Sequence, residues 1–217
     1  MAGRERIVVV FDAVGDPAAF VQMAVSLAQG LDAEVLGVFL EEAEAMAMAE
    51  LPFTSVVDAG GQLQPLGKET LEAAWRAAAG KARERLNRAA DQARLPWAFE
   101  VTRGRLAAAM EKAQGARATL VAGHRAASRG VAAPVVAAAD LPRADALARR
   151  AASLLRTEPV LCVLDTSEAD PVRRAIQHCE QRHAPLLVVS SADPLWAGAA
   201  LDDLRKRASL PILVLDE

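Results

Sequence analysis

The chain has 217 residues and a formal net charge of −3, and 53% of its residues are hydrophobic while only 4% are aromatic. This length suits one large domain or one and a half small ones, and the charge gives no reason to expect the concentrated basic face that binds nucleic acid. The two cysteines, Cys162 and Cys179, are too few for a disulfide framework, and no uninterrupted apolar run approaches the ~20 residues of a membrane span. We therefore expect a cytoplasmic protein that binds neither nucleic acid nor a membrane.

The first forty residues predict a βαβ unit. Arg6–Asp12 (RIVVVFD) is a continuous, largely β-branched run, which is typical of a strand buried on both faces of a parallel sheet. Asp16 and Pro17 then predict the N-cap and first turn of a helix, and Glu34–Leu40 (EVLGVFL) predicts a second strand. A strand, a helix and a strand in this order form a parallel pair with a helical crossover.

The segment 42–66 is harder to interpret. Its first part, AEAMAMAE, favours a helix, whereas the remainder is rich in turn residues and has little periodicity. Two interpretations stay open. Either Met46, Met48, Leu51 and Phe53 pack onto the domain, or the segment is a surface flap that is presented to a partner protein.

Helices and strands alternate through the rest of the chain. The patterns predict helices over 68–94, 105–114, 143–155, 168–183 and 195–208, and strands over 97–102, 119–122, 159–165, 185–190 and 211–215. We expect the strand over 159–165 to be the fifth of a first unit. The alternation predicts an α/β fold, an open doubly wound parallel sheet with helices on both faces.

An internal repeat is visible within this alternation. Residues 8–40 line up with residues 160–190, and Asp12 at the end of one strand falls on Asp165 at the end of the other. Self-similarity of this kind indicates duplication of the βαβ unit. The second copy lacks the long helix and the third strand, so it is truncated.

With its elements in this order, the chain resembles the universal stress protein family. Four features carry the resemblance: the opening strand that ends in Asp12, the long helix before a third strand, the VAGH strand end at 121–124, and DALARRAASLLRTEPVLCVLD at 145–165. The resemblance implies a Rossmann-like sheet of the HUP type. It assigns residues 1–165 to one family domain and residues 166–217 to a truncated second βαβ repeat, packed on or continuing the same sheet.

The resemblance also implies a homodimer. Members of the family commonly pair through their closing strand, which would be PVLCVLD at 159–165 or PILVLDE at 211–217. A short aliphatic strand such as Ile212–Leu215 would otherwise leave an open sheet edge.

The candidate ligand site is the loop after the fourth strand, where open α/β sheets bind phosphates at the carboxyl ends of their strands. Nucleotide-binding members of the family carry glycine, two residues, glycine, nine residues, and then glycine with serine or threonine. Gly123 matches the first position, but Ala126 replaces the second glycine and no later pair fits. An alanine Cβ restricts the approach of the backbone to a phosphate. Charge and hydrogen bonds from neighbouring side chains could compensate. The candidate nucleotide- or anion-binding residues are Asp12, Gly123, His124, Arg125, Ser128, Arg129 and Gly130.

Asp12 matches the family position that approaches the nucleotide base, and it could equally be a polar residue that ends the strand and bonds the following turn. We identify no catalytic residue and no metal site. His178 and His183 are five residues apart on one predicted helix, so they point in different directions.

Three functions stay open. The preferred one is a non-catalytic stress-response or regulatory protein with a degenerate nucleotide-binding loop and no expected cofactor. The second is an ATP- or AMP-binding universal stress protein with weak or no hydrolysis. The third is an adaptor that presents the 42–66 segment to a protein partner.

Overall fold

The structure, a computed structural model, describes residues 5–13, 17–52, 54–57, 61–121, 133–165 and 170–216. Its strands are β1 (Arg6–Phe11), β2 (Glu34–Glu42), β3 (Ser55–Val57), β4 (Leu63–Pro65), β5 (Trp97–Gly104), β6 (Ala118–Val121), β7 (Val135–Ala138), β8 (Val160–Val163), β9 (Leu187–Ser190) and β10 (Ile212–Leu215). Its helices are α1 (Pro17–Leu31), α2 (Ala43–Ala49), α3 (Lys68–Ala93), α4 (Leu106–Lys112), α5 (Leu141–Leu155), α6 (Pro171–Gln181) and α7 (Ala199–Arg207), with a short 3-10 helix η1 (Pro194–Trp196).

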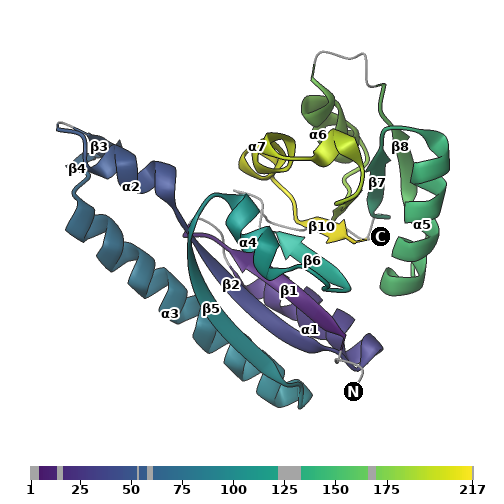
Figure 1. The fold of residues 1–217 in the computed structure, drawn as a ribbon, viewed down its shortest axis with the longest axis horizontal. Helices are drawn as coiled ribbons and strands as arrows, with labels where there is room; N and C mark the ends of the chain where they lie inside the picture. Colours follow the sequence, from purple (N-terminus) through teal and green to yellow (C-terminus); the bar gives the residue numbers. More distant parts are fainter. Residues whose placement is uncertain are drawn as a thin grey trace.

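Eight of these strands form one sheet in the order β5-β2-β1-β6-β10-β9-β7-β8, and β3 and β4 form a separate hairpin (Figure 1). The first half of the sheet, β5-β2-β1-β6, is parallel throughout. In it Val8 lies beside Leu36 on one side and beside Thr119 on the other. The continuous apolar run of β1 is buried on both faces, as the sequence predicts for the interior of a parallel sheet.

The second half of the sheet, β10-β9-β7-β8, is also parallel within itself. The two halves meet where β10 pairs antiparallel with β6, with Leu213 beside Leu120. Both leucines are completely buried, so the junction is part of the core. Because of this reversal, the strands of the second half finish at the end of the sheet where β1 and β6 begin.

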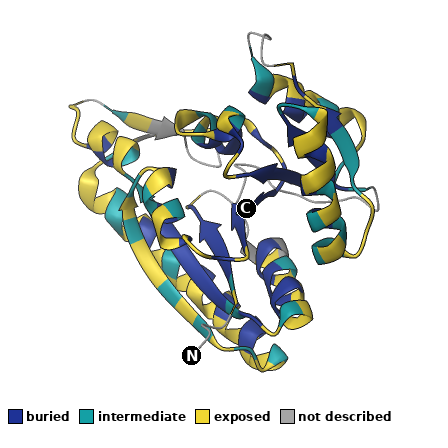
Figure 2. Cartoon of the chain, turned by 45° about the vertical axis from the view of Figure 1, so that its right-hand side comes forward, coloured by how far each residue is buried: buried dark blue, intermediate teal, exposed yellow. Residues whose placement is uncertain are grey.

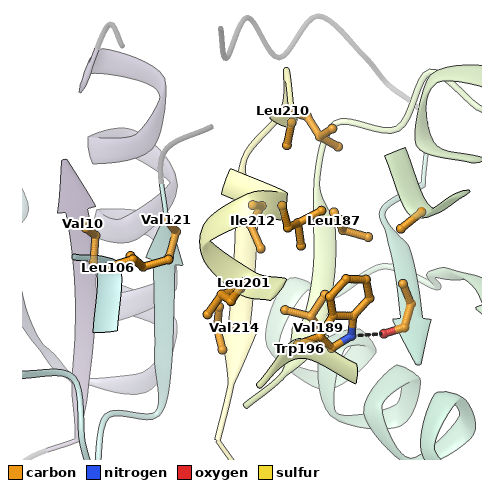
Figure 3. Close-up of a cluster of buried hydrophobic side chains, with 14 of the residues drawn as sticks. Val10, Leu106, Val121, Leu187, Val189, Trp196, Leu201, Leu210, Ile212 and Val214 are labelled. Atoms are coloured by element: carbon orange, nitrogen blue, oxygen red, sulfur yellow. Dashed lines mark hydrogen bonds between the residues drawn. The ribbon is translucent and has the colours of Figure 1, made fainter. Parts of the chain in front are cut away.

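Helices cover both faces of the sheet. On one face the apolar sides of α1, α3 and α5 pack against the strands. On the other face α4, α6, α7 and η1 do so, and Figure 3 shows Leu201 and Trp196 of this layer beside Val189 and Val214. Figure 2 shows the strands of the sheet mainly as buried and the outer sides of the helices as exposed. The structure thus confirms the predicted doubly wound α/β sheet. None of the described helices is long and apolar enough to cross a membrane.

The positions of two closing strands differ from the sequence prediction. We expected 159–165 to follow the fourth strand as the fifth of the first unit, but β8 pairs with β7 at the far edge of the sheet. We expected Ile212–Leu215 to leave an open edge, but β10 lies between β6 and β9, with both of its sides paired. The division of the chain at residue 165 stays a prediction.

The segment around α2 and the β3–β4 hairpin extends beyond the sheet next to the start of α3 (Figure 1). Met46 is buried, as the packing interpretation expects. Met48 and Leu51 are instead exposed, as is Leu63 on the hairpin. Phe53 lies outside the described residues. The segment is therefore held through the buried side of α2, at Met46 and Ala49, and exposes apolar side chains elsewhere.

Candidate functional site

A completely buried arginine lies at the carboxyl ends of β1 and β2. Only 1% of the Arg205 side chain is exposed. Its Nη1 donates a hydrogen bond to Oδ2 of Asp12 at 2.9 Å. Its Nη2 donates to Oε1 of Glu42 and, at 3.4 Å, to Oδ1 of Asp202. One guanidinium therefore bridges the ends of two adjacent strands.

The fold explains why these groups meet. Asp12 follows β1 directly and Glu42 is the last residue of β2, which runs three residues beyond Phe39, the partner of Phe11, so both carboxylates lie at the carboxyl ends of neighbouring parallel strands. On α7, Leu201 and Leu204 are buried against the sheet. Arg205 is one residue further along this buried side, so its side chain is directed at the strand ends and not at solvent. Helix α7, from the second half of the chain, thereby covers the carboxyl ends of β1 and β2 in the first half.

The charges around Arg205 keep it ionised. Burial alone disfavours the charged guanidinium, but its hydrogen bond to Glu42 and the negative charges of Glu42, Asp12 and Asp202 outweigh this effect. Together they raise the pKa of Arg205 above its ordinary value. The Nε atom of Arg205 is also buried and has no hydrogen-bond partner among the described residues.

A second layer of charge surrounds this core. Lys206 lies 2.9 Å from Asp202 and 2.8 Å from Glu44, and Glu44 lies 3.1 Å from Arg105. The space left beside Arg205, between Asp202, Gly104 and Leu106, is about 10 Å³. That is room for about one water molecule, whereas small-molecule sites measure roughly 300–1,000 Å³. In the part of the chain that the structure describes, the carboxylate of Asp12 is thus already bound by the guanidinium of Arg205.

Of the predicted site residues, only Asp12 lies within the described part of the chain. Gly123, His124, Arg125, Ser128, Arg129 and Gly130 lie outside the described residues. The structure brings Asp12 together with Glu42, Asp202 and Arg205, none of which we had selected as a candidate. A signal for Arg205 was present, because Leu201, Leu204, Arg205 and Ala208 follow the spacing of a helix's buried stripe.

The second half of the sheet has its own point where the strand order reverses, between β7 and β9, and its own side chains fill it. Asp193 is 1% exposed, and its carboxylate accepts hydrogen bonds from the backbone N–H of Ala139 at 2.9 Å and of Leu195 at 3.0 Å. The indole Nε1 of Trp196 donates to the carbonyl of Ala137 at 3.2 Å. Trp196 is 2% exposed and packs in the buried cluster on this face of the sheet (Figure 3).

Other groups that could carry chemistry do not converge. No group of three or more His, Cys, Asp or Glu side chains among the described residues could hold a metal ion. Burial raises the pKa of the Cys179 thiol to about 12, with a further contribution from Cys162, so the thiolate nucleophile is disfavoured. Burial also lowers the pKa of His178, and the positive charges of Arg182 and Arg174 lower it further.

Comparison with known proteins gives a likeness of fold. No protein-family model and no curated protein matches the chain. A universal stress protein from Archaeoglobus fulgidus is 8% identical, the match covering 96% of this chain and 98% of that one with a TM-score of 0.45. One from Burkholderia pseudomallei is 14% identical, with coverages of 99% and 96% and a TM-score of 0.32. A universal stress protein in complex with cAMP is 11% identical, with coverages of 99% and 98% and a TM-score of 0.27. At these identities the likeness concerns the fold alone.

Proposed function

We propose that the protein is a cytoplasmic, non-catalytic stress-response or regulatory protein of the universal stress protein type, with a degenerate nucleotide-binding loop. The observation that carries the proposal is the ion pair between Arg205 and Asp12. The sequence resemblance assigns the position of Asp12 to the nucleotide base. In this chain the same carboxylate holds a buried arginine.

The energetic argument follows from burial. A base that approached Asp12 would have to displace the guanidinium and leave charges unpaired, and breaking a buried ion pair costs about 3–5 kcal/mol. A penalty of that size would lower an affinity by a factor of roughly 100 or more. In the sequence, Ala126 in place of the second glycine of the motif acts in the same direction.

Calorimetric titration of the purified protein with ATP, ADP, AMP and cAMP tests the proposal. We expect no binding at ligand concentrations up to the millimolar range. A submicromolar affinity that is lost in Arg125→Ala and retained in Arg83→Ala, an exposed arginine on α3, would instead support the ATP- or AMP-binding alternative. Mass spectrometry of small molecules released from freshly purified protein is an independent check.

A second function, an adaptor that binds a protein through the 42–66 segment, is favoured by a specific observation. Met48 on α2, Leu51 just after it and Leu63 on β4 are 51%, 59% and 74% exposed. Exposed apolar side chains on an element that extends beyond the sheet are typical of a surface that binds another protein. Leu51→Asp and Leu63→Asp should each abolish capture of a partner from cell extract. Leu141→Asp, at an equally exposed leucine on α5, should not.

The expected homodimer is proposed through β8. This strand lies at the edge of the sheet beside β7, and Val163 is 47% exposed. An edge strand offers unpaired backbone groups to a second copy. Light scattering at micromolar concentration should give the mass of a dimer for the wild type and of a monomer for Val163→Lys. Val101→Lys, on the opposite edge strand β5, should stay dimeric, and a wild-type monomer would refute the proposal.

A further inference from the structure

We propose that a groove between α1 and α5, remote from Asp12, binds a small organic anion with an apolar body. The central part of this groove is a hollow of about 420 Å³, lined by Leu31 at the end of α1, Leu154 on α5 and Leu215 on β10. Arg117, Arg149 and Arg150 line the same hollow. Its volume lies within the roughly 300–1,000 Å³ range of small-molecule sites.

The layout of the sheet explains why a groove exists here. An α-helix is about 10 Å across and strands lie about 4.8 Å apart, so one helix covers about two strands. On this face α1 packs over β1 and β2, whereas α5 packs over β7, β8 and β9. The junction strands β6 and β10 lie between the two helices. The groove runs along these two strands.

The groove also opens where an α/β sheet binds ligands. In such sheets ligands bind outside the carboxyl ends of the strands. The antiparallel junction brings the carboxyl ends of β9 and β10 to the end of the sheet at which β6 begins, and the groove opens at this end, beside Arg117 and Leu215. A further hollow of about 550 Å³ extends over them, lined by Ser191 and Asp216, and it shares Arg117 and Arg150 with the central hollow.

The arginines are available to a ligand. Arg117 and Arg149 are exposed, and neither side chain makes a hydrogen bond or an ion pair within the described ranges. Arg150 is half-buried and donates to the backbone carbonyl of Asp216, which holds it at the groove. The residues that line the central hollow include no acidic side chain, whereas Glu5 and Asp216 line the adjoining hollow, so the central hollow is the more favourable of the two for an anion. Arginine is the side chain best suited to bind phosphate or carboxylate.

The other wall of the groove offers apolar surface among polar side chains. Beyond Leu154 lies a third hollow of about 680 Å³, whose lining includes Met23, Leu27 and Leu155 together with the polar residues Gln22, Ser26, Gln29 and Arg156. An anionic group on the arginines would leave the rest of the ligand against these side chains. The combination fits an amphiphilic small molecule better than a free inorganic ion.

Phenyl phosphate is the probe, and inorganic phosphate is the comparison that lacks an apolar body. Calorimetry should show phenyl phosphate binding to the wild type at least about tenfold more tightly than inorganic phosphate. The double variant Arg117→Ala/Arg149→Ala should lose about tenfold or more of this affinity, since hydrogen bonds to charged groups are being removed. Leu154→Ala should weaken phenyl phosphate and leave inorganic phosphate unchanged.

Arg83→Ala is the matched control, because it removes one exposed arginine from α3 without touching the groove. Equal affinities of the wild type and the double variant would overturn the proposal, and so would an equal loss in Arg83→Ala. Equal binding of the two phosphates would overturn the apolar part of the assignment. Asp12→Asn separates this site from the proposed function, because phenyl phosphate affinity should be unchanged in that variant whatever ATP does.

Discussion

Arg205 and Asp12 are 193 residues apart in the sequence, and 2.9 Å separates Nη1 of the arginine from Oδ2 of the aspartate. The arginine lies on α7, which precedes β10 of the second half of the sheet, and the aspartate follows β1 of the first half. The pair therefore joins the two halves at the strand ends. Glu42 and Asp202 accept further hydrogen bonds from the same guanidinium. The contact therefore has a structural role as well as the role proposed for it above.

Replacing this arginine should destabilise the protein strongly. Arg205→Ala leaves Asp12, Glu42 and Asp202 buried or partly buried without their shared cation, and we expect the free energy of unfolding to fall by about 3–5 kcal/mol. Urea denaturation followed by circular dichroism measures this change. Arg207→Ala, an exposed arginine on the same helix, should leave the denaturation midpoint close to that of the wild type. Similar midpoints for the two variants would contradict the assignment.

Gly37 on β2 should not tolerate a side chain. A Cβ built there would lie 2.7 Å from Cδ2 of Leu86 and 2.7 Å from Cδ2 of Phe99, both of which are packed between α3 and the sheet. Gly37→Ala should therefore cost about 1–3 kcal/mol through overpacking. The matched variant Gly30→Ala lies in helix α1 with no atom within 4 Å of the new Cβ. It should raise the stability by about 0.5–1 kcal/mol, and thermal melts of both variants decide the comparison.

Cys179 predicts a loss of stability in alkali. Its pKa is raised to about 12 in the folded protein from an ordinary value of 9.0, mainly by burial. Between these two values the folded state keeps a proton that the unfolded state releases, so the free energy of unfolding falls as the pH rises from 9 towards 12. Denaturation across this range should show a steeper fall for the wild type than for Cys179→Ala. Parallel slopes would contradict the burial of the thiol.

Asp193 is expected to stabilise the turn after β9. Its carboxylate accepts two backbone hydrogen bonds, from Ala139 and Leu195, in a nearly solvent-free position. Asp193→Ala should destabilise the protein by about 1–3 kcal/mol, because two partly buried N–H groups lose their acceptor. Asp193→Asn, which retains one acceptor oxygen, should lose less. If the two variants melt together with the wild type, the carboxylate is not holding the turn.

The predictable part of the fold was the part set by local patterning. The run between Arg6 and Asp12 is apolar at every position from Ile7 to Phe11, and these residues form a strand buried on both faces as that pattern requires. Strand β7 was missed because it ends in Ala137 and Ala138. Alanine has a weak preference for strands, and here only tertiary burial favours one.

The pairing of distant strands was less predictable. The sequence of β10 is that of a short aliphatic strand whether it lies at an edge or in the interior, so Ile212–Leu215 carried no signal of its two neighbours. The direction of β10 relative to β6 depends on the crossovers that precede it. That direction determines where α7 lies, and so where Arg205 lies. The pairing of Asp12 with Arg205 was therefore not predictable from local patterning.

The position of β10 has a consequence for biosynthesis. Of the described strands in the sheet it is the last to be made, yet it fills a gap between β9, made just before it, and β6, made much earlier. Until it arrives, β6 and β9 each expose an unsatisfied flank that could pair with a neighbouring polypeptide. A ribosome-bound chain arrested before residue 212 should therefore need a chaperone to prevent aggregation, and emergence of Ile212–Leu215 should remove that need.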